Sequence, residues 1–134
     1  MSVTPREVVE RFWQVMGGND FHAASLLLAE DFEYFMPQTG EYLSGRGNFA
    51  GLNADYPAQG LWRFDLQRIL QDGAQVVTEV GVTDGSMQAV AITFHHVRGG
   101  LIWRQVEYWP DPYQAPEARA RYVTRLDKAP DWAR

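Results

Sequence analysis

The stretch that decides the fold is the last predicted strand, Leu101-Ile102-Trp103-Arg104-Gln105-Val106-Glu107-Tyr108-Trp109. It follows the tight turn Arg98-Gly99-Gly100 and stops at Pro110. Side chains alternate across a strand, so one face is predicted to hold Trp103, Gln105, Glu107 and Trp109. The opposite face is predicted to hold Ile102, Arg104, Val106 and Tyr108. One face therefore carries a carboxylate and an amide between two indoles, a composition that suits the wall of a small-molecule pocket.

The residues before this strand show the same period of two. From Leu61 onward apolar and polar residues alternate, and hairpin-type turns occur at Asp72-Gly73 and Asp84-Gly85. Further strands are predicted over Gln75 to Thr83 and Met87 to Val97. Four strands joined by short turns predict an antiparallel meander.

The first half of the chain has helical patterns instead. Thr4-Pro5-Arg6-Glu7 combines a cap, a proline at the first helical position and a capping box. The apolar residues that follow at helical spacing are Val8, Val9, Phe12, Trp13 and Met16. Gly17-Gly18 ends this helix, and Asn19 or Asp20 caps a second helix that closes at Glu30-Asp31.

The middle of the chain and its end carry weaker signals. A short strand is predicted over Phe32 to Met36, a turn-rich stretch over Thr39 to Gly47, and a third helix over Asn48 to Tyr56. After Trp109-Pro110, residues 116–126 have a pattern compatible with one more helix. Helices followed by a long meander indicate an α+β domain whose helices cover one face of a curved sheet.

Length and composition limit the function classes. The 134 residues are expected to form one domain, residues 1–134, with a core over about 4–112 and a C-terminal extension over 113–134. The net charge is −5 without a run of Lys or Arg, which argues against nucleic-acid binding. The chain has no Cys, and no stretch approaches the length and apolar content of a membrane span. We therefore expect a soluble, cytoplasmic protein.

Glu107 is the carboxylate most suited to chemistry. The 17 Asp and Glu residues mostly occupy caps and turns, whereas Glu107 lies mid-strand among aromatic residues. It is either solvated, paired with a cation, or desolvated in a cavity. In the last case its pKa rises and it becomes a general acid or base near neutral pH.

His95 is the second candidate catalytic residue. His95 and His96 are adjacent on a strand and face opposite sides, so they do not bind one metal ion together. No His pair has metal-ligand spacing, and we expect neither a metal site nor a cofactor. His95 is predicted to share the Glu107 face; the alternative is a half-buried strand histidine with a structural hydrogen bond.

Aromatic residues from separate elements are candidates to line a ligand cavity. Aromatics make up 13% of the chain, which is consistent with a cavity, an interface or an aromatic core. The candidates for substrate binding, together with Gln105, are Trp13, Tyr34, Trp62, Trp103 and Trp109. Core packing is the alternative role for each of them.

Several short sequence segments, taken in their order along the chain, resemble those of a known family. They are Val9-Glu10-Arg11-Phe12-Trp13, Gly18-Asn19-Asp20, Leu27-Leu28-Ala29-Glu30-Asp31-Phe32, Ser44-Gly45-Arg46-Gly47 and Glu107-Tyr108-Trp109. Together they are similar to the SnoaL-like, polyketide-cyclase-like group of the nuclear-transport-factor-two-like superfamily. The resemblance covers roughly Thr4 to Pro112. It implies a cone, a curved mixed sheet wrapped around three helices with an internal pocket, and a homodimer that pairs through the sheet near Arg104, Val106 and Tyr108.

Function does not follow from this fold, and it depends on the residues at the family's catalytic positions. Where ketosteroid isomerases have Tyr, Asp and Asp, this chain has Phe12, Met36 and Thr93, which argues against that mechanism. The Asp-Arg-Asp set of the epoxide hydrolases is missing. Glu107 falls where the polyketide cyclases place an acidic residue. Their supporting His maps near Thr93, so that partner is missing in this chain unless His95 substitutes for it.

Two hypotheses follow from these comparisons. In the first, a small, apolar, carbonyl-bearing compound binds among the aromatic residues, and Glu107 moves a proton in isomerase, cyclase or lyase chemistry. Gln105 or His95 then orients the substrate oxygen. In the second, the chain is a non-catalytic ligand-binding or dimeric interaction module of the same fold.

Overall fold

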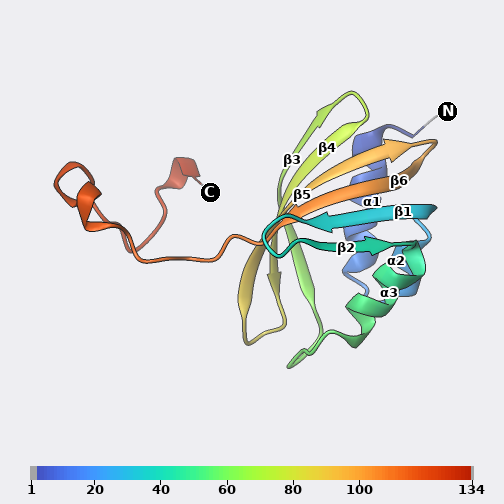
Figure 1. Ribbon diagram of the computed structural model, residues 1–134, viewed down its shortest axis with the longest axis horizontal. Helices are drawn as coiled ribbons and strands as arrows, with labels where there is room; N and C mark the ends of the chain where they lie inside the picture. The colour runs from blue at the N-terminus through green and yellow to red at the C-terminus, as the bar shows by residue number, and fades with distance from the viewer. Residues whose placement is uncertain (1–2, 134) are drawn as a thin grey trace.

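The computed structural model describes residues 3–133, in which helices pack on one six-stranded sheet (Figure 1). The strands are β1 Leu28–Met36, β2 Glu41–Ser44, β3 Arg63–Asp72, β4 Gln75–Thr83, β5 Gln88–Arg98 and β6 Leu101–Tyr108. Their order across the sheet is β2-β1-β6-β5-β4-β3, so β2 and β3 form the two edges of an open sheet. The predicted α+β class with a mixed sheet is confirmed.

The meander predicted from the turn signals is present. β3, β4, β5 and β6 pair with one another antiparallel in chain order, and β4 has the bounds that the sequence predicts. Gly99 and Gly100 both have positive φ, 59° and 78°, the backbone that a tight hairpin turn requires and that glycine adopts without strain. β1 pairs parallel to β6, which makes the sheet mixed and places the first strand beside the last.

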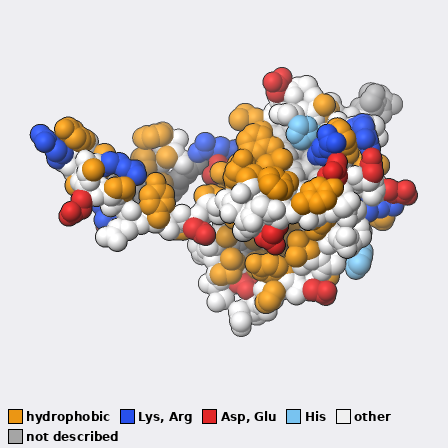
Figure 2. Space-filling model, viewed as in Figure 1, with side chains coloured by type: hydrophobic (Ala, Val, Ile, Leu, Met, Phe, Trp, Pro, Cys, Tyr) orange, Lys and Arg blue, Asp and Glu red, His pale blue; other side chains and the backbone are white. Residues whose placement is uncertain are grey.

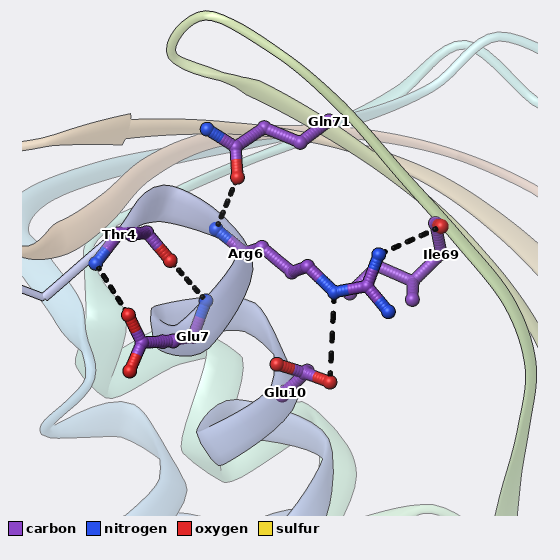
Figure 3. Close-up of polar contacts among 6 residues, drawn as sticks. All are labelled: Thr4, Arg6, Glu7, Glu10, Ile69 and Gln71. Carbon is purple, nitrogen blue, oxygen red and sulfur yellow. Dashed lines mark hydrogen bonds and ion pairs between the residues drawn. The ribbon is translucent and has the colours of Figure 1, made fainter.

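Helix α1, Pro5–Met16, begins as its sequence predicts. Thr4 Oγ1 accepts a hydrogen bond from the Glu7 backbone N–H, and Glu7 Oε1 accepts one from the Thr4 N–H, both at 3.1 Å (Figure 3). Arg6 ties this first turn to β3: its backbone N–H donates to Gln71, and its guanidinium donates to the Ile69 carbonyl. These two hydrogen bonds fix the N-terminus of α1 against β3, an edge strand of the sheet.

The core lies between the helices and the inner face of the sheet. α1 contacts β3, β4, β5 and β6, while α3, Arg46–Asp55, contacts β1 and β2. The apolar residues of α1 at helical spacing are buried against the sheet, and Phe12 and Val9 are almost wholly enclosed. Burying such side chains contributes about 1.5–3 kcal/mol each.

The second helix and the first strand differ from the prediction. Helix α2, Phe21–Ser25, has five residues, and β1 begins at Leu28, where the sequence predicts helix. Leu28 is fully buried and pairs with Ile102, so pairing with the last strand overrides a local pattern that is apolar in either conformation. β2 forms in the stretch predicted as turns because Tyr42 and Leu43 pair with Phe35 and Tyr34 of β1.

The chain beyond β6 forms an arm, defined here as residues 110–133, that extends away from the sheet (Figure 1). It contains two 3₁₀ helices, Glu117–Tyr122 and Asp131–Ala133. The helix predicted over residues 116–126 is wrong as an α-helix: the segment forms only a short 3₁₀ helix, and its apolar residues Tyr122, Val123 and Leu126 are exposed, so burial does not stabilise a longer helix. None of the helices in residues 3–133 has the length and apolar character to cross a membrane.

Candidate functional site

The Glu107 carboxylate is buried on the inner face of β6, with 7% of its surface exposed. Three side chains donate hydrogen bonds to it. The Tyr34 hydroxyl donates to Oε1 at 2.5 Å, the Trp109 indole Nε1 donates to Oε1 at 3.0 Å, and Thr93 Oγ1 donates to Oε2 at 2.6 Å. We call these four residues the Glu107 cluster.

Three different strands position this cluster. Thr93 of β5 lies directly opposite Glu107 of β6, so their side chains meet on the same face of the sheet. Tyr34 comes from β1, which reaches β6 through the parallel pairing. Trp109 follows β6 directly, and Gln38 holds its backbone by accepting from the N–H at 2.6 Å and donating to the carbonyl at 3.0 Å. The long-range pairing of β1 with β6 is therefore what assembles the site.

Burial raises the pKa of Glu107 above its ordinary value of 4.5, and the hydrogen bonds from Thr93, Tyr34 and Trp109 lower it by less. Burial and the nearby carboxylate likewise raise the pKa of Tyr34, so this hydroxyl keeps its proton and acts as a donor. A carboxylate offers about four acceptor positions. Within residues 3–133, Oε1 receives two donors and Oε2 one, which leaves acceptor capacity on Oε2.

His95 belongs to a second buried group, which we call the His95 cluster: His95, Thr78, Gln105 and Trp13. Gln105 Nε2 lies 2.9 Å from His95 Nδ1, and Thr78 Oγ1 lies 2.8 Å from Nε2. Trp13 Nε1 donates to the same Thr78 oxygen at 3.2 Å. Both ring nitrogens thus have protein partners, and His95 is completely enclosed.

The environment of His95 keeps the imidazole neutral. Burial, with a smaller contribution from the charge of neighbouring His96, lowers the pKa of His95 to about 3. A neutral ring has one N–H donor and one acceptor nitrogen, which matches its two partners, Gln105 and Thr78. The aromatic rings of Phe12 and Trp13 pack edge-on against the imidazole. These contacts suit a structural role.

A groove on the surface is lined in part by Tyr34, whereas Glu107, Thr93 and Trp109 are not among its lining residues. It has a volume of about 280 Å³ and lies between β1, β2 and α3. Its lining residues are Tyr34, Met36, Glu41, Tyr42, Leu43, Ser44, Asn48 and Leu52. Tyr34 is the one residue that belongs to both this lining and the Glu107 cluster. A ligand in the groove would contact Tyr34, the residue whose hydroxyl donates to Glu107.

The predicted site residues fall into separate places. Tyr34 and Trp109 contact Glu107, whereas Trp13, Gln105 and His95 form the other cluster. The prediction that His95 shares the face of Glu107 agrees with its burial, but the hydrogen bonds of its ring go to Thr78 and Gln105. Trp62 is partly buried; its backbone is held by Asn19, and its ring contacts Tyr56.

The prediction that Trp103 shares a face with Glu107 is wrong. The pairing of β5 with β6 shifts between His96 and Val97, so Trp103 is an extra residue in a β-bulge. Its ring lies on the outer face under the guanidinium groups of Arg98 and Arg104, 4.5 Å and 3.9 Å from the ring centroid. The bulge also turns Ile102, predicted to face outward, into the core.

The sequence predicts no partner for Glu107, because Thr93 stands where relatives have an acid or a histidine. A hydroxyl suffices here, since it donates to the carboxylate across the β5–β6 pair. The signal available in the sequence was the register. Counting outward from the Gly99-Gly100 turn, with one residue allowed for a bulge, places Thr93 opposite Glu107 and His95 opposite Gln105.

Comparisons with known proteins agree with this architecture. The model of the SnoaL-like domain matches residues 9–105. A solved structure from Kribbella flavida, provisionally assigned as a ketosteroid isomerase, is 31% identical, covers 92% of this chain and 90% of its own, and has a TM-score of 0.84. An NTF-2 like protein of unknown function from Burkholderia xenovorans is 27% identical, with coverages of 91% and 94% and a TM-score of 0.75.

A more distant solved structure shows the fold alone. It is an LEH-like epoxide hydrolase from M. tuberculosis, 23% identical over 79% of this chain and 82% of its own, with a TM-score of 0.66. No curated protein sequence matches the chain.

Proposed function

Because this chain belongs to the SnoaL-like domain family, we propose that it binds a small, largely apolar carbonyl compound beside Tyr34 and that Glu107 moves a proton on that compound. The observation that carries the proposal is the burial of Glu107 among three donors on the inner face of the sheet. Burial raises the pKa of this carboxyl, which brings it toward the range where one group both takes up and returns a proton.

In the proposed reaction Glu107 acts first as a base. Oε2 removes a proton from the carbon next to the substrate carbonyl, and the electron pair of that C–H bond passes to the carbonyl oxygen as an enolate. The single O–H of Tyr34 donates to Glu107 Oε1 while that carboxylate is charged. In the proposed step, once Oε2 has taken the substrate proton, the same O–H turns from the neutral carboxyl to the enolate oxygen, which is the stronger acceptor. The protonated Glu107 then returns the proton to carbon, which balances an isomerisation without a further reactant.

The other members of the cluster hold the base in place. Thr93 and Trp109 each donate to a different oxygen of the carboxylate, Thr93 to Oε2 and Trp109 to Oε1. His95 is not a proton carrier in this scheme, because its low pKa and its two hydrogen bonds keep the ring neutral and occupied. Its contribution is to hold Gln105 next to the pair Thr93–Glu107 in the sheet.

A second candidate function is ligand binding without turnover. Met36 lines the groove at the position where the family's isomerases carry an Asp, and a thioether takes no proton. Phe12, at the position of their Tyr, is enclosed in the core and has no hydroxyl. In this case the three donors satisfy Glu107 as a buried structural carboxylate.

The test uses Glu107→Gln with Glu33→Gln as its matched control. Glu33 is also a hydrogen-bonded strand carboxylate, but it lies on the outer face with Tyr42 and Arg104. A panel of apolar ketones and enones is screened for binding, and the compounds that bind are followed for isomerisation. The proposal predicts that Glu107→Gln lowers turnover by roughly 10²–10⁴-fold with little change in affinity, while Glu33→Gln has no effect. Ligands that bind but are never converted by the unaltered protein support the binding module instead.

A homodimer that pairs through the outer face of the sheet is also proposed. The outer face carries the apolar side chains of Val106 and Phe94 between Phe35 and Tyr108, of which the last two are 40% and 37% exposed. Figure 2 shows hydrophobic side chains gathered over this face. Sedimentation at micromolar concentration that gives a monomer would contradict this pairing.

A further inference from the structure

We propose that Gln38 is a positioning residue for Glu107, which acts by holding Trp109 so that its indole N–H stays on the carboxylate. The proposal deepens the proposed function and rests on it only for the effect on turnover. Gln38 lies in the turn between β1 and β2 and is exposed, whereas Glu107 is buried. An exposed side chain thus acts on a buried acid/base through one intermediate residue.

The register of the sheet brings Gln38 beside Trp109. β1 and β6 run parallel, with Phe35 opposite Val106. Three residues further along each strand direction, the same register reaches Gln38 on one side and Trp109 on the other. β6 ends one residue before Trp109, and Pro110, which has no N–H, follows it. The position of Trp109 therefore depends on contacts outside the regular strand pairing.

The backbone of β1 does not continue the pairing to this point. Pro37 has no N–H to donate, and the Gly40 N–H turns back to the Met36 carbonyl at 2.9 Å. The side-chain amide of Gln38 takes the place of the next peptide group: Oε1 accepts from the Trp109 N–H at 2.6 Å, and Nε2 donates to the Trp109 carbonyl at 3.0 Å. A primary amide has the donor and the acceptor of a peptide group, so it can make both bonds. We call this pair of bonds an amide clamp.

Holding the Trp109 backbone determines where its ring lies. Residues two apart in an extended chain point to the same side, so Trp109 shares the inner side with Glu107. Its indole Nε1 donates to Glu107 Oε1 at 3.0 Å. Burial and the charge of Glu107 raise the pKa of Tyr34, and a side-chain hydrogen bond from the indole offsets a part of this rise. The indole N–H therefore lies where Tyr34 and Glu107 meet.

A second amide clamp shows what is particular about Gln38. Asn19 makes the same pair of bonds with the backbone of Trp62, accepting from its N–H at 2.8 Å and donating to its carbonyl at 2.7 Å. The Trp62 ring packs against Tyr56, so that clamp orders a loop. The ring that Gln38 holds in place donates to a buried carboxylate, so its clamp also affects the proton affinity of that group.

In the proposed reaction the Trp109 N–H is the donor that remains on Oε1. Tyr34 turns to the enolate oxygen once Oε2 has taken the proton, and Thr93 donates to Oε2. A donor that stays on Oε1 keeps the carboxyl in place and stabilises its charged form when the proton returns to carbon. Without the Gln38 clamp the indole is free to leave, and the charged form of Glu107 loses this stabilisation.

The test replaces Gln38 by Met, which has nearly the same length and no amide. Gln71→Met is the matched control. Gln71 also uses an exposed amide to hold a backbone group, since it accepts from the Arg6 N–H at 3.1 Å. It lies on β3, however, which β4 and β5 separate from the strand of Glu107.

The readout is the carboxyl titration of Glu107, followed by NMR in the folded protein. Loss of the indole donor in Trp109→Phe should raise the Glu107 pKa and move the titration midpoint up by roughly one pH unit. Gln38→Met should move the midpoint in the same direction. Because Gln38 acts through the indole, the double variant should rise no further than Trp109→Phe alone. Gln71→Met should leave the midpoint unchanged.

The titratable groups around the carboxyl are the same in all these variants. Within residues 3–133 they are Tyr34 of β1, Glu41 of β2, which acts on Tyr34 through its charge, and the neutral His95 of β5. A moved midpoint therefore reports on the indole. An unchanged midpoint in Gln38→Met, or a double variant whose rise is the sum of the two single rises, overturns the proposal.

The titration separates this proposal from the proposed function. If the unaltered protein converts no compound, the proposed function fails, and the comparison of midpoints still decides the role of Gln38. If a compound is converted, Gln38→Met should lower kcat several-fold with little change in KM and shift the acid limb of the pH profile upward with the midpoint. A lowered kcat with an unmoved pH profile would contradict positioning through the indole.

Discussion

The Glu107 cluster and the His95 cluster lie two residues apart on the same pair of strands. They differ in whether the titratable group keeps an exposed fraction and a capacity for further hydrogen bonds. The register places Thr93 opposite Glu107 and His95 opposite Gln105. His95 is fully enclosed and both its ring nitrogens are engaged. Glu107 keeps a small exposed fraction, has acceptor capacity on Oε2, and contacts a tyrosine that lines a groove.

The difference teaches how one sheet face serves both structure and chemistry. Within residues 3–133 every buried side-chain nitrogen and oxygen has a hydrogen-bond partner, so burial of polar groups alone does not mark a site. The pKa shifts separate the two clusters: burial makes the imidazole a weaker base and the carboxyl a weaker acid. A group whose shift moves toward neutral pH is suited to proton transfer, and that group is Glu107.

The largest expected effect is on stability, from His95→Leu. The substitution leaves the Gln105 amide and the Thr78 hydroxyl short of a buried partner, which costs about 2–5 kcal/mol of the free energy of unfolding. His96→Leu is the matched control, because His96 is the adjacent, half-buried residue on the outer side of β5, and it should cost much less. Urea denaturation measures both. Equal losses would show that the His95 cluster is not a closed structural unit.

Next in size is the dependence of stability on pH, which should have opposite signs in the two clusters. The pKa of His95 is lowered from 6.5 to about 3, so its contribution to stability is lost as pH falls through that window, by up to roughly 1.4 kcal/mol per unit. The pKa of Glu107 is raised, so its contribution is present below pH 4.5 and is lost as pH rises through the folded-state value.

The corresponding measurement compares denaturation curves of the unaltered protein with those of Glu107→Gln and His95→Gln between pH 3 and 8. Each substitution should remove one of the two slopes and keep the other. Curves that stay parallel across this range for Glu107→Gln would contradict a shifted carboxyl pKa.

A smaller effect is expected from Tyr34→Phe. It removes the 2.5 Å hydrogen bond to Glu107 and should cost about 1.5–3 kcal/mol if the acceptor is charged. Tyr42→Phe removes a comparable bond to Glu33, but on the exposed outer face, and should cost under about 1 kcal/mol. Thermal and urea unfolding distinguish the two. In Tyr34→Phe the pKa of Glu107 should also rise further, because a donor to its charged form is lost.

The smallest effect is predicted for Trp103→Leu. The ring lies between Arg98 and Arg104 on the outer face, so its loss should leave ligand affinity and turnover unchanged and cost about 0.5–1 kcal/mol of cation–π stabilisation. Trp109→Phe, which removes a donor to Glu107, should by contrast change turnover. A loss of ligand binding in Trp103→Leu would show that Trp103 contributes to the ligand site.

Most of the fold could be predicted from the sequence, because the signals for its first helix and its turns are local. The capping box at Thr4 and Glu7 and the glycine turns of the meander determine their own surroundings within a few residues. The strand β1 was not predictable at its start, because Leu28 is apolar in either a helix or a strand and the decision rests on its pairing with Ile102. The resemblance to the SnoaL-like family supplied the arrangement that these local signals do not.

Of the candidate site, only the central residue, Glu107, could be placed from the sequence. Alternation places Glu107 on the inner face, but it fails at Trp103, where one extra residue reverses the face of the strand. The partners Tyr34 and Thr93 come from strands 73 and 14 residues away, so their contact depends on register rather than on any pattern along the chain. A bulge and a parallel pairing are properties of the assembled sheet, and a single strand does not reveal them.

The central claim, that Glu107 is a desolvated acid/base, is tested most directly by the pKa of its carboxyl, measured by carbon-detected NMR titration of the folded protein. Glu33 provides an internal reference, since its bonds to Tyr42 and Arg104 lower its pKa. The account predicts a Glu107 pKa clearly above the ordinary 4.5, with the Glu33 pKa below it. A Glu107 pKa at or below 4.5 would mean that the three donors outweigh burial, and the carboxylate would then be a structural anion without a proton to exchange.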